Sequence, residues 1–175
     1  MAKTFLSDIA LSEKSYQKLD ELYRIRFGEK GRKITNIERF GPDNKPEYDK
    51  QLHQDLSIDI DGLTIFGQEK ILRNEFIKFN TFTIEFYQNR FTKEEGEFFN
   101  LHVQFFTHGY WDHKEEGFAK LYIIKLPKFM KWLKKEYTMD QIKQMTKEDQ
   151  NSNASFFYFD YDKIPQECIF HREVS

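Results

Sequence analysis

Two neighbouring stretches of this chain carry side chains that can do metal-assisted chemistry. Asp59 ends one run of alternating residues, and after eight intervening residues Gln68, Glu69 and Lys70 follow within a second run. Glu85 lies in a third run of the same kind. A carboxylate, further oxygen ligands and an ammonium group can together bind a hard divalent cation and stabilise a phosphoryl group. The pattern therefore points to phosphodiester hydrolysis assisted by Mg²⁺ or Mn²⁺.

The alternation of side chains along a strand gives each of these residues a role. On a strand from Leu63 to Leu72, Gln68 and Lys70 share one face and Glu69 points to the other. If Asp59 lies on the neighbouring strand, its carboxylate is expected to approach Gln68 and Lys70. Asp59 then supplies the charge that binds the metal, and the Gln68 side chain and the Glu69 backbone carbonyl complete the ligand shell. Lys70 positions water or stabilises charge on the phosphoryl oxygens.

Glu85 offers a further carboxylate for the same cation, because it lies on the next expected strand.

The spacing of these residues resembles the PD-(D/E)xK motif of the restriction-endonuclease-like nucleases. The resemblance covers about residues 10–135, and it extends to uncharacterised members of phages and bacterial mobile elements. It implies a nuclease that acts on DNA, with Asp59 and Lys70 as metal-binding and catalytic residues and Gln68 at the position of the second acid. The sequence departs from the family pattern in having Ile58 where the family has proline, and Gln68 where it has a carboxylate.

A simpler interpretation of the same residues stays open. Asp59 can flank a hairpin turn, where aspartate is favoured, and Gln68 and Lys70 can form the solvent face of an amphipathic strand. The alternative function is then a catalytically degenerate, nuclease-like binding or inhibitor protein of a phage or mobile element. Its target would be a protein.

Basic side chains outside the motif are candidates for contacts with nucleic-acid phosphates. Arg73 follows the motif on the same strand, and Lys128, Lys131 and Lys135 share one face of an expected helix. The same spacing is also typical of a solvated helix face. The aromatic pair at residues 110–111 can stack on bases or pack in the core.

The elements that must position these residues follow from hydrophobic periodicity and turn signals. A helix is expected from Ser12 to Gly28, the pair Asp61-Gly62 is typical of a hairpin turn, and Pro127 and Thr138 are expected to open two later helices. Strands are expected at residues 34–40, 56–60, 63–72, 81–88, 98–106, 121–126 and 156–161, with turns at 41–46 and 107–112.

This order predicts an α+β fold with a central, mostly antiparallel or mixed sheet flanked by helices. We expect one nuclease-like domain over residues 1–175, with the motif in a core at about 10–135 and later helices and a strand at 127–165.

Composition narrows the class of protein. The chain of 175 residues has a formal net charge of -2, so that any nucleic-acid surface must be a local patch. Its one cysteine, Cys168, excludes an intrachain disulfide and favours a reducing compartment, and we expect a cytoplasmic protein. No apolar run approaches the roughly 20 residues of a membrane span. A homodimer would suit cleavage of both strands of a duplex, although the sequence specifies no interface.

Overall fold

The computed structural model describes residues 2–41, 53–149 and 152–174, with side chains from Lys14 onward. It has an α+β fold built on two sheets, a six-stranded mixed sheet in the order β1-β2-β3-β6-β7-β10 and a four-stranded antiparallel sheet in the order β5-β4-β9-β8. The α+β prediction is therefore confirmed. The second sheet is an addition that the sequence did not predict.

The strands of the six-stranded sheet are β1 (Ile34–Arg39), β2 (Leu56–Ile60), β3 (Leu63–Arg73), β6 (Phe105–Asp112), β7 (Gly117–Ile124) and β10 (Ile169–Val174). The strands of the other sheet are β4 (Thr81–Asn89), β5 (Glu94–Glu95), β8 (Thr146–Glu148) and β9 (Ser155–Asp160). The α-helices are α1 (Ala2–Phe27), α3 (Glu97–Asn100), α4 (Leu126–Glu136) and α5 (Met139–Gln144).

The hairpin of β2 and β3 has the predicted two-residue turn. Asp61 and Gly62 have φ angles of 51° and 80°, the left-handed conformation that such a turn requires. The turn pairs Ile60 with Leu63, and the register runs on without a shift to the pair Leu56 and Gly67. Beyond the hairpin, β3 pairs with β6 in parallel.

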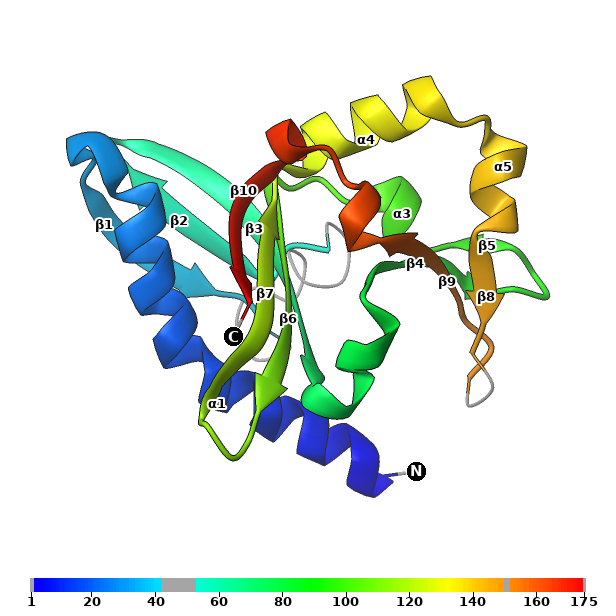
Figure 1. The fold of residues 1–175 in the computed structure, drawn as a ribbon, viewed down its shortest axis with the longest axis horizontal. Helices are drawn as coiled ribbons and strands as arrows, with labels where there is room; N and C mark the ends of the chain where they lie inside the picture. Colours follow the sequence, from blue (N-terminus) through cyan, green and yellow to red (C-terminus); the bar gives the residue numbers. More distant parts are fainter. Residues whose placement is uncertain (1, 42–52, 150–151, 175) are drawn as a thin grey trace.

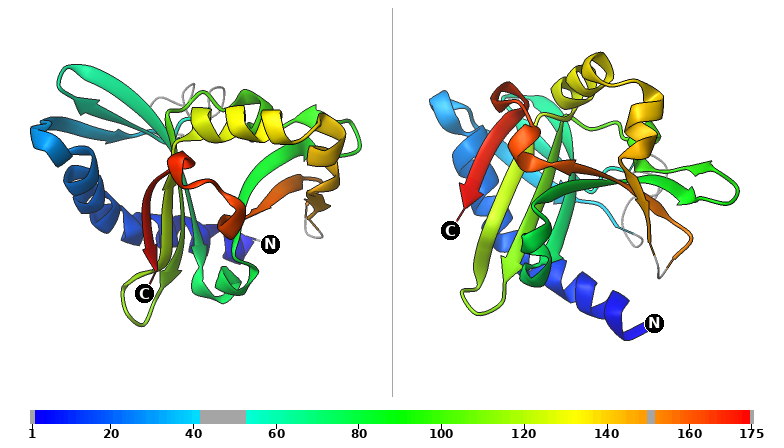
Figure 2. Two further views of the ribbon diagram at one scale, coloured as in Figure 1. Left: turned by 45° about the horizontal axis from the view of Figure 1, so that its top comes forward. Right: turned by 45° about the vertical axis from the view of Figure 1, so that its right-hand side comes forward.

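The central strands of the six-stranded sheet are buried on both faces, and each face has its own apolar core. Helix α1 covers one face, where Leu19, Tyr23 and Phe27 pack with residues of β2, β6 and β7 (Figure 1). The four-stranded sheet and α4 cover the other face, where an aromatic core forms between the sheets. The two views of Figure 2 show the same order of layers.

The two tryptophans belong to different cores. Trp111 on β6 lies in the core under α1, where its ring packs edge-on against Phe118. Trp132 on α4 packs against Phe159 of the four-stranded sheet, at the border of the core between the sheets.

Several helix predictions are confirmed and others are wrong. Helix α1 ends before Gly28 as predicted but begins at Ala2 and not at Ser12. Pro127 lies in the first turn of α4, and Thr138 caps α5 by a capping box with Gln141. No helix among the described residues is long and apolar enough to cross a membrane.

Two predictions between residues 98 and 112 are wrong. The expected strand at 98–106 is instead α3 followed by an extended segment, and β6 begins only at Phe105. The expected turn at 107–112 lies inside β6, where it is buried on both faces, and the turn itself falls at residues 113–116. Of the predicted loop at 41–46, all but Gly41 lies outside the described residues.

Gly67 provides a test of the packing under the motif. A Cβ at this position would overlap the ring of Phe105, which is 2% exposed, whereas a Cβ at Gly41 would meet no atom of the described residues within 4 Å. We expect Gly67→Ala to lower the free energy of unfolding by about 1–3 kcal/mol, the usual cost of overpacking, and Gly41→Ala to change it by less than about 0.5 kcal/mol. Urea denaturation of both variants measures the difference, and equal stabilities would contradict the described packing of β3 on β6.

Candidate functional site

The predicted triplet is divided between the two faces of the sheet. Gln68 and Lys70 point toward the four-stranded sheet with Phe66 and Leu72, which pack on the aromatic core. Glu69 points toward α1, where its carboxylate contacts Tyr23. Gln68 and Lys70 therefore have surroundings that differ from those of Glu69.

Gln68 meets a carboxylate that the sequence did not single out. Its Nε2 lies 3.5 Å from Oε1 of Glu97, at the start of α3, and the other oxygen of Glu97 accepts a hydrogen bond of 3.3 Å from the backbone N–H of Glu85. Gly96 permits this approach, because a Cβ there would lie 2.8 Å from the carbonyl oxygen of Glu85. Gln68, Glu85 and Glu97 therefore form one cluster.

The side-chain oxygen of Gln68 is the least satisfied atom of this cluster. Gln68 is 8% exposed, and its buried Oε1 has no hydrogen-bond partner among the described residues. A buried acceptor without a partner has a free-energy cost of about 1–3 kcal/mol. A cation, or water held by one, would remove that cost.

Lys70 lies beside the two glutamates without forming an ion pair with any described residue. Its Nζ is 4.5 Å from the centre of the Phe156 ring, and Phe156 is the cross-strand partner of Glu85. Burial first, then the charge of Glu97, raises the pKa of Glu85, and the charge of Lys70 acts in the opposite direction. The ammonium group therefore acts electrostatically on the Glu85 carboxylate and can still move toward a ligand.

Asp59 does not approach this cluster, and the predicted convergence with Gln68 and Lys70 is wrong in its geometry. The register places Asp59 opposite Thr64, whose hydroxyl donates a 2.7 Å hydrogen bond to the carboxylate. Four residues of β3 separate Thr64 from Gln68, or about 13 Å at roughly 3.3 Å per residue. Asp59 therefore lies near the turn of the hairpin.

Asp55 is the carboxylate that the hairpin brings to Gln68. Its N–H donates to the carbonyl of Gly67, and its Oδ2 accepts a 2.7 Å hydrogen bond from the N–H of Glu69. These two bonds bracket Gln68 on β3. The signal was present in the sequence, because a two-residue turn at 61–62 pairs Ile60 with Leu63 and, counted outward, brings Asp55 opposite Gln68.

Glu69 is held in an ion-pair network on the α1 side of the sheet. Its oxygens accept hydrogen bonds of 3.1 Å from two nitrogens of Arg39 and one of 2.8 Å from the hydroxyl of Tyr23. Arg39 also contacts Asp20 of α1 at 2.7 Å. The Glu69 carboxylate is therefore engaged away from Gln68, and only its backbone is left for the ligand role that the sequence predicts.

His108 neighbours Lys70 on the adjacent strand and belongs to the core. Its ring nitrogens contact the hydroxyls of Thr83, at 3.2 Å, and Tyr161. Burial, and then the charge of Lys70, lowers the pKa of His108 well below its usual range. The neutral imidazole therefore joins the two sheets beside the cluster. Tyr110 and Trp111 on the same strand are also buried in the core.

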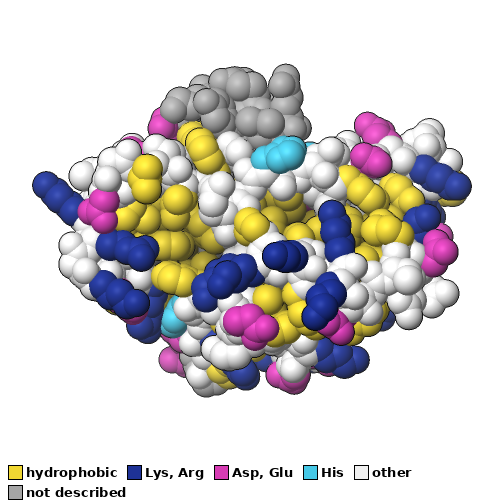
Figure 3. All heavy atoms as spheres, turned by 90° about the horizontal axis from the view of Figure 1, so that it is seen from above, with side chains coloured by type: hydrophobic (Ala, Val, Ile, Leu, Met, Phe, Trp, Pro, Cys, Tyr) yellow, Lys and Arg dark blue, Asp and Glu magenta, His cyan; other side chains and the backbone are white. Residues whose placement is uncertain are grey.

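The predicted basic residues do not gather around the cluster as one group. Arg73 lies on the Glu69 face of β3, because it is separated from Glu69 by four residues of a strand with alternating sides. Lys128, Lys131 and Lys135 are exposed on the outer side of α4. Figure 3 looks down on the face that carries α4 and shows lysine and arginine side chains around exposed apolar ones.

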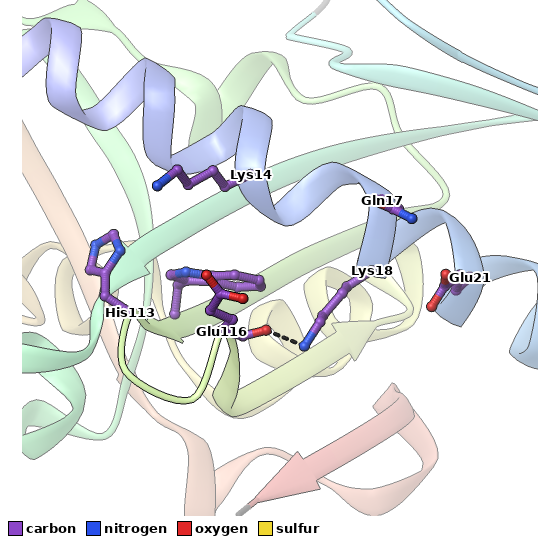
Figure 4. A pocket seen from close by; sticks show the side chains of 7 residues that line it. Lys14, Gln17, Lys18, Glu21, His113 and Glu116 are labelled. Atoms are coloured by element: carbon purple, nitrogen blue, oxygen red, sulfur yellow. Dashed lines mark hydrogen bonds between the residues drawn. The ribbon is translucent and has the colours of Figure 1, made fainter.

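A hollow lies on the α1 side of the six-stranded sheet, between α1 and the turn of β6 and β7 (Figure 4). It has a volume of about 330 Å³ and is lined by residues of both charge signs. Lys18 donates to the backbone carbonyl of Glu116 across it and lies 5.6 Å from the Trp111 ring. The ammonium group of Lys18 therefore already has partners within the protein. The hollow is separate from the cluster at Gln68.

No group of three or more His, Cys, Asp or Glu side chains among the described residues is arranged to hold a metal ion. Mg²⁺ commonly takes only one or two carboxylates, with water and substrate phosphate as further ligands. Comparisons with protein-family models, curated proteins and solved structures find no match for this chain. The resemblance to PD-(D/E)xK nucleases therefore stays a prediction.

The ion pair behind the motif gives a stability prediction. We expect Arg39→Met to lower the free energy of unfolding by about 3 kcal/mol, because it leaves the Glu69 carboxylate, 5% exposed, without its cation. The double variant Arg39→Met/Glu69→Met should be more stable than the single one, since no charge is left buried. Chemical denaturation of the four proteins of the cycle tests this, and additive losses would contradict the described pair.

The raised pKa of Glu85 gives a pH dependence. The unfolded chain releases this proton near the ordinary pKa of 4.5, and the folded chain releases it at higher pH, so that stability is lost as pH rises through this window. We expect Glu85→Gln to raise the melting temperature at pH 7 by about 1–2 °C, after allowance for solvent screening. The gain should vanish at pH 4.

The control for this measurement is Glu75→Gln, because Glu75 is exposed. A gain that persists at pH 4, or that the control shares, would contradict the described surroundings of Glu85.

Proposed function

We propose that this chain is a divalent-metal-dependent nuclease whose site is formed by Asp55, Gln68, Lys70, Glu85 and Glu97. The observation that carries the proposal is the buried side-chain oxygen of Gln68 beside Glu97, which has no hydrogen-bond partner in the described part of the chain, with Lys70 on the same face. Asp55 takes the place that the sequence assigned to Asp59, because it lies at the end of the neighbouring strand beside Gln68. DNA is the proposed substrate, as the resemblance implies.

The donor set fits a hard cation such as Mg²⁺ or Mn²⁺. Gln68 offers a neutral oxygen, and neither Glu85 nor Glu97 forms an ion pair with a described residue. Two carboxylates that share a desolvated site repel one another, and a divalent cation between them removes this repulsion. Gln68 and Glu97 would hold the cation, with water and a substrate phosphate as further ligands. When bound, the cation supplies a Lewis acid for the phosphoryl oxygen and lowers the pKa of a coordinated water.

Lys70 would stabilise charge in the reaction, because its ammonium group forms no ion pair with the residues that the structure describes. Its ammonium group can donate hydrogen bonds to the attacking water or to a phosphoryl oxygen, where negative charge increases in the transition state. The ammonium group itself lies over the Phe156 ring, with Nζ 4.5 Å from the ring centre. Glu69, fixed by Arg39, keeps Gln68 and Lys70 on the same face of β3.

A cleavage assay tests this function. We expect wild type to cleave DNA in Mg²⁺ or Mn²⁺, and Lys70→Met and Glu97→Gln to lower the rate by at least about 100-fold, the usual loss when a charge-stabilising group is removed. Asp59→Asn is the matched control and should retain wild-type activity, because Asp59 lies at the hairpin turn.

Metal binding gives a second readout on the same proteins. Mn²⁺ should raise the melting temperature of wild type and of Asp59→Asn but not of Glu97→Gln, because only a folded site gains from binding. Wild type without cleavage and without a thermal shift would refute the proposal. Equal activity in all variants would also refute it, because it would indicate a contaminating nuclease.

The separation of Asp59 from Gln68 and Lys70 favours a second function, the catalytically degenerate binding or inhibitor protein. In that case the cluster is a relic, and the chain acts by contact with a protein target. Glu97→Gln and Lys70→Met would then leave target binding intact, and metal would leave the melting temperature unchanged.

A further inference from the structure

A groove with an apolar floor lies beside the proposed site, between α4 and the segment 98–104. Its volume is about 370 Å³, near the lower end of the range of small-molecule pockets, about 300–1,000 Å³. Phe99, Leu101 and Met130 line it as partly buried side chains. Figure 3 shows exposed apolar side chains on this face of the molecule, surrounded by lysine and arginine side chains.

The groove is connected to the proposed site along the chain and by hydrogen bonds. Glu97 of the site is followed directly by Phe98 of the groove. Gln104 of the groove accepts a 2.6 Å hydrogen bond from the N–H of Phe66, two residues before Gln68. Gln54, which precedes Asp55, donates a 2.8 Å hydrogen bond to the carbonyl of His102. Three separate segments therefore hold the groove in a fixed position relative to the site.

The charge of the groove suits an anionic occupant. Among the described residues, Lys134 and His102 are its ionisable lining residues, both are exposed, and no carboxylate lines it. Lys131, one turn earlier on α4, is exposed as well. The acidic side chains lie instead in the adjoining cluster at Glu85 and Glu97. An anionic chain that extends from the groove to the cluster would thus contact lysine side chains first, and then the proposed metal site.

The lining also offers an aromatic surface. Phe99 belongs to a cluster with Phe86, at 4.8 Å between ring centres, and with Tyr87 and Phe98. This packing fixes the ring on one side, while its partly exposed remainder lines the groove. Aromatic rings held in this way are where proteins stack unpaired bases, and stacking is tolerant of sequence because every base has a π face.

We propose that this groove binds an unpaired base of a single-stranded nucleic acid, next to the phosphate that the neighbouring cluster hydrolyses. The role in cleavage rests on the proposed function, and the binding itself does not. A groove of this size accepts a base only when the base has left its stack, so that the groove selects single strands, flaps or frayed ends over intact duplex. Phe99 provides the stacking surface and Lys134 contacts the adjacent phosphate.

Binding measured without metal tests the groove apart from catalysis. Fluorescence anisotropy of a labelled mixed-sequence oligodeoxynucleotide, in EDTA, gives the affinity for the single strand and for the same sequence as a duplex. We expect wild type to prefer the single strand. Phe99→Leu keeps an apolar side chain but removes the ring, and should weaken single-strand binding at least about fivefold. Lys134→Glu should also weaken it and should reduce the dependence on salt concentration.

Matched controls carry the same chemical changes away from the groove. Phe91→Leu alters a phenylalanine that is 71% exposed, and Lys114→Glu alters an exposed lysine in the turn after β6. Both should bind as wild type does. Circular dichroism and melting temperature show that Phe99→Leu and Lys134→Glu remain folded.

The results separate the two proposals. Single-strand binding that is unchanged in both groove variants, or absent from wild type, overturns the groove proposal even if DNA is cleaved. Specific loss in the groove variants supports it, even where no cleavage and no thermal shift with Mn²⁺ are found. Equal loss in the control variants would also overturn it, because the binding would then be a general effect of surface charge.

Discussion

Side chains alternate along β3, and β3 lies in the part of the sheet that has an apolar core on each face. The rest of the structure depends on this constraint. It sends Gln68 and Lys70 into one core and Glu69 into the other. A polar residue in either core needs a partner, because an unpaired buried group has a large free-energy cost. The long helix α1 and strand β1 supply that partner on one side, through Arg39 and Tyr23, and the four-stranded sheet and α3 face the other side.

The partly buried carboxylates have different surroundings on the two faces of the sheet. On the α1 side the Glu69 carboxylate has a guanidinium group at hydrogen-bond distance on both of its oxygens. On the other side Glu85 and Glu97 approach one another, and burial together with their mutual repulsion raises the pKa of Glu85. The first arrangement is complete within the protein and is suited to holding a strand in place. The second has carboxylates, a buried amide oxygen and a lysine that forms no ion pair with a described residue, which is an arrangement that a ligand can complete.

Local signals in the sequence predicted local structure well. The turn at Asp61-Gly62 and the helix start at Thr138 were predicted correctly, because each depends on residues close in sequence. Strand β6 was mistaken for a turn because Thr107 and His108 look like surface residues. Their partners are Tyr23, Thr83 and Tyr161, which lie far away along the chain.

The site was predicted in part for the same reason. Gln68, Lys70 and Glu85 were found from alternation along strands, which is local. Glu97 was missed because it reaches Gln68 only through the packing of α3 against β4. Asp59 was chosen by its spacing along the chain, whereas the register of the hairpin decides which residue lies across from Gln68, and that residue is Asp55.

The division of the molecule into two cores also gives it two intrinsic fluorophores that report on different layers. The chain has two tryptophans, and Trp111 senses the core under α1 while Trp132 senses the contact of α4 with the four-stranded sheet. Detachment of the helix layer and separation of the two sheets would therefore change different emission signals. A single-tryptophan version of the protein would show whether both layers melt as one cooperative unit, without any external label.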